Sequence, residues 1–475
     1  MGKLVKSLFL TAVAALTVAT CNRHMGNLWL YLGFTIVSNV LMLNGFRRRA
    51  LFFDTFIGAF LWLGFWLKFS VYIAFGSGVF NEPVGLFNGS AGAFDKALLV
   101  STSGIAAVLV ASLLRERLFC YPDKLPRQQG SNFFKFYKKH RICILASFLL
   151  AVVFFAISNV WLGIYQRGII PQTKLPFGLN GIYKWMLQFG LASFSALIVR
   201  FEIEINSKLS WVSVATVLLE TFLSNISLLS RGMILNFSAL AFGTTRMLQA
   251  LQISRNRFVN WVAVFFFCVA FALSVPLVNF VRVYKGAIHE TSDSPCIQAP
   301  LPSLNMLSKR MITSLFLDRW VGMEGVMAVS AYNQLGWKLW RDAWEEKFQD
   351  GKLSLYDSRL IDSPYRRIEI THPGLHHVSL PGMIAFLYYP GSLAFLFVGV
   401  FGCALVAGAV EIGVFYMCGR NLILCALIGQ VIAYRLASFG YVPNQSYLYF
   451  GTVVMNLFLI AVLEHMPSRK LPKVV

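Results

Sequence analysis

Long apolar stretches separated by short polar segments dominate the chain up to about residue 463. A run of about 20 mainly apolar residues is long enough to cross the hydrocarbon core of a bilayer as a helix. The pattern predicts twelve such helices, at about 4–20, 26–43, 51–75, 97–114, 142–161, 182–199, 211–229, 232–249, 260–281, 386–409, 421–439 and 447–463. We therefore expect an all-α, polytopic membrane protein.

The longest interruption of this pattern covers residues 282–381. It divides the chain into a first bundle of about nine helices (1–281), a large loop with amphipathic helices (282–381), and about three last helices with a basic tail (382–475). Within the loop, a helix at about 318–349 is predicted, because apolar residues recur at four-residue spacing and three tryptophans accompany them. Such a helix is expected to rest at the membrane surface.

Composition supports the membrane assignment. Hydrophobic residues make up 57% of the chain and charged residues only 13%, against roughly 25% charged residues in a typical soluble domain. The mean hydropathy of +0.63 agrees. A soluble globule, a disordered chain, a coiled coil and a nucleic-acid-binding domain are therefore excluded.

The first apolar stretch has a second interpretation. Lys3 and Lys6 precede it, and Thr17–Cys21 resembles a weak processing site. These are features of a signal peptide. Cleavage there would leave eleven membrane spans and the same topology for the rest of the chain.

The distribution of basic residues predicts the orientation. The formal net charge is +21. If the N-terminus is inside, the cytoplasmic segments hold 22 Lys and Arg residues, and the short external loops hold six. Segment 282–381 holds twelve basic and eleven acidic residues, and loops of this length carry little weight in the positive-inside rule. We expect both termini in the cytoplasm and 282–381 outside.

Motifs for a metal or a bound cofactor are missing from the sequence. The eight cysteines are scattered without a Cys-x-x-Cys spacing, which argues against a disulfide framework and a cysteine zinc site. A phosphate-cradling glycine loop and a nucleophile elbow are also absent,. We expect neither a metal nor a cofactor.

Charged residues inside the predicted spans are candidates for function. Lys68, Glu220 and Arg435 lie within spans, where a charge costs roughly 2.5–3.5 kcal/mol on insertion scales,. Asp54 and Glu411 lie nearer the ends of spans. Each of these residues is either functional or part of a structural ion pair.

Four arginines are predicted on the external side. Arg167 lies in an external loop, Arg231 where a span ends, Arg319 at the head of the loop helix and Arg435 near the outer end of its span. The planar guanidinium suits phosphate oxygens. If the four converge on one cavity, they predict a diphosphate-bearing ligand; if they are dispersed, they do not.

The loop also holds candidates for a general base. His372 and His376 belong to a His-x3-His-His pattern, and histidine titrates near neutral pH. A general base, a metal ligand and a structural or substrate-contacting role remain as alternatives, although Pro373 and Gly374 break the helical spacing that zinc sites use. Glu324 is the rival base.

Several motifs carry a resemblance to a known family. They are Leu63–Lys68, the Arg-x10-Gly pattern from Arg167 to Gly178, Ser230–Gly232, Arg319–Gly325, Pro381–Ser392 and Ala433–Gly440. In this order, with this topology, the chain resembles the Wzy-type O-antigen (oligosaccharide repeat unit) polymerases from about residue 50 to 450. One departure is that the large loop lacks a second Arg-x10-Gly, since the position eleven residues after Arg366 is His377.

The resemblance implies a helical, GT-C-like, metal-independent glycosyltransferase of the bacterial inner membrane. It would transfer a glycan from undecaprenyl diphosphate to a lipid-linked repeat unit, with inversion, at the periplasmic face. Arg231, Arg319 and Arg435 would contact the diphosphate, and Arg167 would hold glycan. His372 or His376 would be the base, with Lys68 as a further electrostatic contact. A polysaccharide chain-length regulator is a candidate partner, and nucleic acid is not expected.

Three other functions share parts of this pattern. An O-antigen ligase would use the same donor and transfer to a lipid A core. A flippase would move the same lipid, although no similarity between two halves of the chain is visible,. A non-catalytic assembly subunit would place Arg231 and Arg435 in separate regions.

Overall fold

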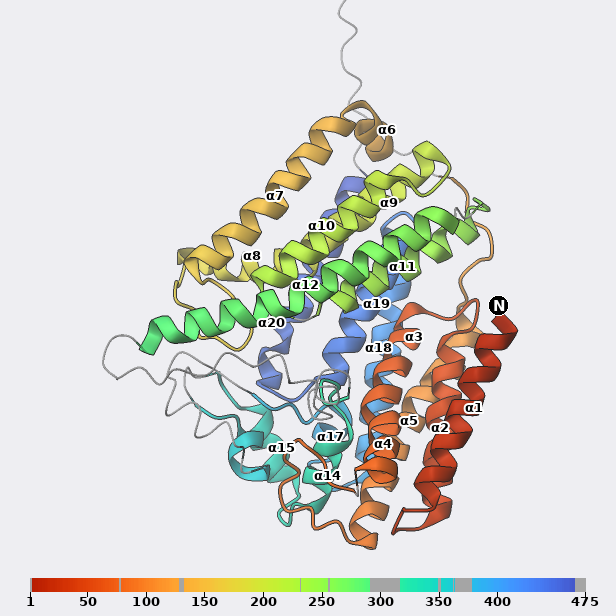
Figure 1. Ribbon diagram of the computed structural model, residues 1–475, viewed down its shortest axis with the longest axis vertical. Helices are drawn as coiled ribbons and strands as arrows, with labels where there is room; N and C mark the ends of the chain where they lie inside the picture. The colour runs from red at the N-terminus through yellow and green to blue at the C-terminus, as the bar shows by residue number, and fades with distance from the viewer. Residues whose placement is uncertain are drawn as a thin grey trace, which may run out of the picture.

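The computed structural model describes residues 2–76, 78–127, 132–230, 232–254, 257–290, 317–348, 352–361, 363 and 378–465. All regular elements within these ranges are helices (Figure 1). The prediction of an all-α membrane protein is therefore confirmed at this level. The GT-C-like architecture remains a prediction.

Each of the twelve predicted spans is matched by helix, although the span predicted at 386–409 is broken at 388–392 and its long helix begins only at Leu393. They correspond to α1 (Gly2–Cys21), α2 (Leu28–Gly45), α3 (Phe52–Leu61) with α4 (Lys68–Phe75), α5 (Ala91–Leu118), α7 (Arg141–Leu162), α8 (Leu179–Trp185) with α9 (Leu191–Asn206), α10 (Trp211–Ser227), α11 (Met233–Ala250), α12 (Arg257–Glu290), α18 (Leu393–Met417), α19 (Leu422–Ala437) and α20 (Ser446–Glu464). The remaining helices are α6 (Asn132–Lys139), α14 (Met323–Ala331), α15 (Trp337–Trp344) and α17 (Met383–Leu387).

In the described part of the chain, eight helices are long and apolar enough to cross a membrane. Three more, in α1, α10 and α19, are apolar but shorter. Helix α11 is present where a span was predicted, but it belongs to neither group. The chain is thus a helical, polytopic membrane protein, and the count of twelve crossings stays a prediction.

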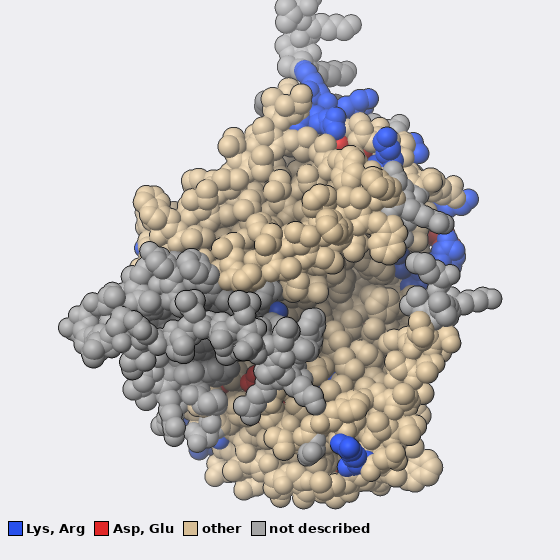
Figure 2. Space-filling model, in the orientation of Figure 1, with Lys and Arg blue, Asp and Glu red and all other residues tan. Residues whose placement is uncertain are grey.

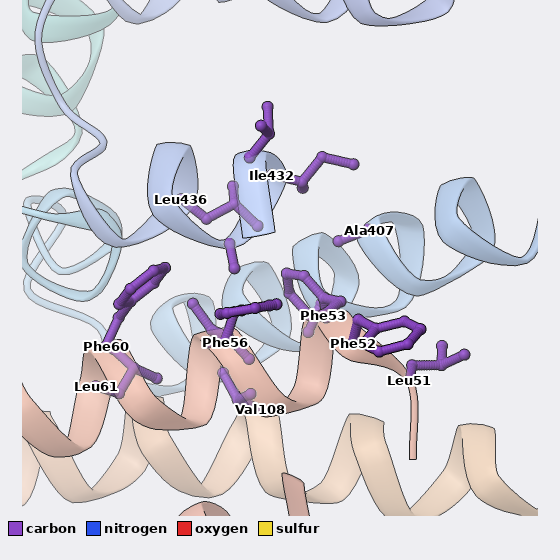
Figure 3. Packing of buried hydrophobic residues seen from close by; sticks show 14 of the residues in the cluster. Leu51, Phe52, Phe53, Phe56, Phe60, Leu61, Val108, Ala407, Ile432 and Leu436 are labelled. Carbon is purple, nitrogen blue, oxygen red and sulfur yellow. The ribbon is translucent and has the colours of Figure 1, made fainter. Parts of the chain in front are cut away.

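The last helices connect two groups of earlier ones. Helices α1 to α5 stand together on one side of Figure 1, and α7 to α12 lie across the other side. Between them, α18 packs on α5, while α19 packs on both α3 and α11. Figure 3 shows this junction, where Phe52, Phe53, Phe56 and Phe60 of α3 lie beside side chains from α5, α18 and α19. Burial of these large rings stabilises the bundle.

The two ends of the bundle differ in charge. Figure 2 shows lysine and arginine side chains gathered at the end where Figure 1 places α6, above a broad uncharged band. We call this the basic end, and the end that carries α14, α15 and α17 the loop end. Helix α1 begins and α20 ends toward the basic end (Figure 1). This separation is the pattern expected when the basic end faces the cytoplasm.

Two of the charged residues near span ends serve the packing of α3. Asp54 pairs with Arg115 of α5. The buried Glu411 of α18 accepts hydrogen bonds from the backbone N–H groups of Phe52 (2.8 Å) and Phe53 (2.6 Å). A carboxylate at a helix N-terminus satisfies otherwise unpaired N–H groups. These acids are therefore structural.

The predicted loop helix at 318–349 is wrong in its extent. The structure has two short helices, α14 and α15, separated at Tyr332–Gly336, and the Gly336 N–H donates to the Tyr389 carbonyl (2.9 Å) instead of continuing a helix. Helix α14 packs on α5 and α17 and is buried, whereas a helix that rests on a membrane surface would have one exposed face. Only α15 keeps the predicted amphipathic character, with Trp337 and Trp340 packed on Phe395 of α18.

Candidate functional site

A close contact between two glycines positions the first part of the site. The third predicted span is interrupted by a π-helical segment, Trp62–Leu67, which directly precedes Lys68. Within it, a Cβ added to Gly64 would collide with Val321, and a Cβ on Gly322 would collide with Gly64. Only glycine at both positions lets the loop segment approach this closely. Insertions of this kind in helices are frequent at functional sites.

This contact brings Lys68 and Glu324 together inside the protein. The Lys68 Nζ atom lies 2.9 and 3.0 Å from the two carboxylate oxygens of Glu324. It also donates to the Trp320 carbonyl at 2.6 Å. Lys68 is 1% exposed and Glu324 is 5% exposed. A buried charge of either sign is costly unless it is paired in this way.

The ion pair lines a cavity of about 190 Å³ at the loop end. Two further carboxylates line it, Glu82 and Asp318. Asp318 accepts hydrogen bonds from the Tyr72 hydroxyl and from Asn81 Nδ2. Among the residues that the structure describes, no group of three or more His, Cys, Asp or Glu side chains is arranged to hold a metal ion. The carboxylates that line the cavity can accept hydrogen bonds from the hydroxyl groups of a polar ligand,.

Burial changes the acidity of the carboxyls in this cavity. It raises the pKa of Glu324 above its ordinary value, while the Lys68 ammonium opposes the shift. It also raises the pKa of Glu82, which the negative charge of Glu324 raises further. A carboxylate with a raised pKa is a better proton acceptor than an exposed one.

A second cluster forms around Arg167. Asn159 of α7 fixes the loop after this helix, because its side chain donates to the Tyr165 carbonyl (2.9 Å) and accepts from the Tyr165 N–H (2.8 Å). The Arg167 N–H then donates to the Leu228 carbonyl at the end of α10 (2.9 Å). The Arg167 guanidinium interacts with the side chains of Tyr434, Tyr165 and Tyr449.

Arg435 joins this cluster from the end of α19. Its guanidinium carbon lies 5.5 Å from the centre of the Tyr449 ring, and Nη2 donates to Ser446 Oγ (3.3 Å). Within the described ranges, neither Arg435 nor Arg167 has a carboxylate at ion-pair distance, and Arg435 Nε is buried without a hydrogen-bond partner. Two guanidinium groups next to the same tyrosine can together attract an anion,.

Aromatic rings join the two clusters. The Trp320 ring stacks on Phe60 with centroids 5.7 Å apart. Phe60 in turn meets the edge of Tyr434 at 5.8 Å. Trp320 is the residue whose carbonyl binds Lys68, and Tyr434 is next to Arg167. The cavity and the arginine cluster therefore share one continuous wall.

The structure places the predicted site residues as follows. Lys68 pairs with Glu324, and Arg167 lies with Arg435. Arg319 is exposed and directly precedes Trp320. Arg231, His372 and His376 lie outside the described residues.

Two described residues, Gly232 and Val378, are close in sequence to Arg231 and His376. A Cβ on Gly232, which follows Arg231, would lie 3.9 Å from Arg167 Nη1. Val378, two positions after His376, lines the cavity of Lys68 and Glu324. The chain thus passes the arginine cluster at Gly232 and the carboxylate-lined cavity at Val378.

Glu220, a further candidate from the sequence, is fully buried in α10. One of its carboxylate oxygens accepts a hydrogen bond from Ser224 Oγ (3.1 Å), and the other has no hydrogen-bond partner in the described part of the chain.

Sequence reasoning missed several residues of the site. Glu82 and Asp318 carried no signal because single acids in polar loops are common. Tyr165, Tyr434 and Tyr449 were missed because tyrosines are ordinary near the ends of membrane spans. Lys184 also contacts the cluster, with Nζ 5.3 Å from the Tyr165 ring centre.

Comparison of the chain with models of protein families, with curated proteins and with solved structures found no match.

Proposed function

We propose that this protein is a glycosyltransferase that joins undecaprenyl-diphosphate-linked oligosaccharide repeat units at the periplasmic face of a bacterial inner membrane. One observation carries the proposal. Arg167 and Arg435, which are distant in sequence, meet around Tyr449, and the rings of Tyr434, Phe60 and Trp320 connect them to a carboxylate-lined cavity. This arrangement supports a site for an anionic leaving group that is connected to a site for a hydroxyl nucleophile.

In this proposal, the oxygen of an acceptor sugar attacks the anomeric carbon of the donor glycan. A new C–O bond forms, and the bond between that carbon and the diphosphate oxygen breaks with inversion. Negative charge grows on the departing lipid diphosphate. Arg167 and Arg435 would stabilise that charge through fixed donors, without requiring a metal.

Glu324 would accept the proton of the attacking hydroxyl. It lines the cavity and is almost fully buried, and the Lys68 ammonium favours its ionised form. In this proposal, Lys68 stabilises the base Glu324 and does not contact the diphosphate. His372 and His376 are the alternative bases, and only the sequence pattern supports them.

The proposed activity can be tested with the purified full-length protein. Lipid-linked repeat units would be extracted from a strain that lacks this chain, so that the cognate units accumulate. In EDTA, we expect a ladder of lengthening glycans on lipid. A single transfer that occurs only when lipid A core is added would instead identify a ligase. Movement of the lipid across proteoliposomes without any transfer would identify a flippase.

The raised pKa of Glu324 predicts the pH dependence. The base must be deprotonated, so kcat/KM should fall as the pH drops through a pKa above the ordinary glutamate value of about 4.3,. Asp318 raises the pKa of Glu324 by its charge, so Asp318→Asn should move this acid limb to lower pH. A pH series of initial rates measures both. An acid limb that stays in place in Asp318→Asn and moves with a histidine substitution would assign the base to the histidine.

A further inference from the structure

An apolar groove lies between α18 and α20, and side chains of α19 also line it. Its volume is about 600 Å³, within the range of small-molecule sites in proteins. Val406 and Val410 of α18 face Phe450 and Val454 of α20 across it, and Leu436 of α19 lies beneath. Trp344 of α15 also lines the groove, so a helix from the loop region contributes to it.

The groove is open along the side of the bundle. On its rim, Val406 is 65% exposed, Tyr447 is 69% exposed and Val454 is 61% exposed. Both flanking helices are candidate membrane spans. Apolar side chains exposed at this depth would face lipid, so an apolar chain dissolved in the bilayer could enter sideways without crossing a polar region.

One end of the groove is polar. Asn444 and Ser446 line it, and Ser446 Oγ accepts a hydrogen bond from Arg435 (3.3 Å). Asn444 Oδ1 and Arg435 Nε are both buried without a hydrogen-bond partner in the described structure. The first can accept from a hydroxyl, and the second can donate to an anionic oxygen. The polar end of the groove therefore adjoins the arginine cluster through Ser446.

Gly402 of α18 leaves space in the groove. A Cβ added to Gly402, which lines the groove, would meet no atom within 4 Å. A bulky side chain at this position would therefore extend into the space that an apolar lipid chain would occupy.

From these observations, we propose that the groove holds the polyisoprenyl chain of an isoprenyl diphosphate, with the diphosphate at Arg435 and the first sugar at Asn444. This inference rests on the proposed function, since it names the part of the chain that recognises the donor's lipid. The lipid would reach Arg435 from the bilayer through the opening between α18 and α20.

The test uses glycine substitutions on two helices. Gly402→Phe would fill the groove from α18. Gly451→Phe is the matched control, because a Cβ on Gly451 of α20 also meets no atom within 4 Å and this residue does not line the groove. Val406→Trp, on the exposed rim, is a second groove-filling variant if Gly402→Phe folds poorly. The full-length proteins would be held in nanodiscs of fixed lipid composition.

The probe is a long-chain isoprenyl diphosphate that carries a diazirine on its chain. We expect it to label peptides of α18 and α20 in the wild type and in Gly451→Phe. In Gly402→Phe or Val406→Trp, its affinity should be at least about tenfold weaker, equivalent to about 1.4 kcal/mol. Unlabelled isoprenyl diphosphate should compete, while polyprenol and phosphatidylglycerol should compete poorly.

Equal competition by phosphatidylglycerol would overturn the proposal, because the groove would then hold bulk lipid. Equal labelling of Gly402→Phe, Val406→Trp and wild type would overturn it as well. The lipid site and the polymerase activity can be refuted independently of each other. A labelled groove without a glycan ladder supports the lipid site and refutes polymerisation. A glycan ladder with an unlabelled groove supports polymerisation and refutes the lipid site.

Discussion

Replacement of Arg435 by alanine is expected to lower kcat/KM for glycan transfer by about 10²–10³, the usual cost of removing one fixed donor to a developing anion. Arg435 has the geometry for this role, because Tyr449 and Ser446 hold its guanidinium beside Arg167. Arg435→Lys keeps the charge but loses the planar fork, so it should recover only part of the activity. Initial rates of ladder formation at low substrate concentration would measure both variants.

The control for Arg435 lies at the other end of the same helix. Arg420 is exposed just before α19 begins, and Arg420→Ala should transfer glycan at the wild-type rate. Protein amount and thermal unfolding would be matched among the three variants. Wild-type activity in Arg435→Ala, or an equal loss in Arg420→Ala, would remove Arg435 from the proposed diphosphate site.

Much of the fold was predictable because membrane helices have a strong, local signal. Every predicted span is matched by helix, and the boundaries of most differ by only a few residues. The loop helix was predicted too long because the four-residue spacing of its apolar residues continues by chance across the break between α14 and α15. Leu335 fits the four-residue spacing, but it lies between α14 and α15, where Asn333 and Gly336 are ordinary helix-ending residues,. Here the local ending signals overrode the periodic pattern.

The candidate site was predictable only as separate residues. Lys68 was identified by its position in a span, and Glu324 by its place in a loop motif. Their pairing depends on the backbone contact between Gly64 and Gly322, which no local pattern reveals. Likewise, the sequence offered convergence of Arg167 and Arg435 on one cavity as one of two alternatives, but only the fold brings Tyr449 of α20 next to both guanidinium groups.

The Lys68–Glu324 pair is expected to give the largest effect on stability. Lys68→Met would leave the Glu324 carboxylate buried without its cation, and breaking a buried pair in this way costs about 3–5 kcal/mol,. Reversible unfolding in mixed micelles would measure the loss. The exposed Arg359–Asp342 pair (3.1 Å) provides the contrast, since Arg359→Ala should cost no more than about 1 kcal/mol.

The double variant Lys68→Met, Glu324→Gln separates a structural pair from a catalytic one. With both charges removed, no unpaired ion remains, so most of the lost stability should return. Activity should not return, because glutamine cannot accept a proton from the acceptor hydroxyl. If the double variant recovered both stability and glycan transfer, the pair would only hold α14 against α4, and the base would have to be another residue. Recovery of stability without recovery of glycan transfer would support Glu324 as the general base. The free-energy cost of a buried, unpaired Glu324 carboxylate would then explain why a lysine is buried beside it.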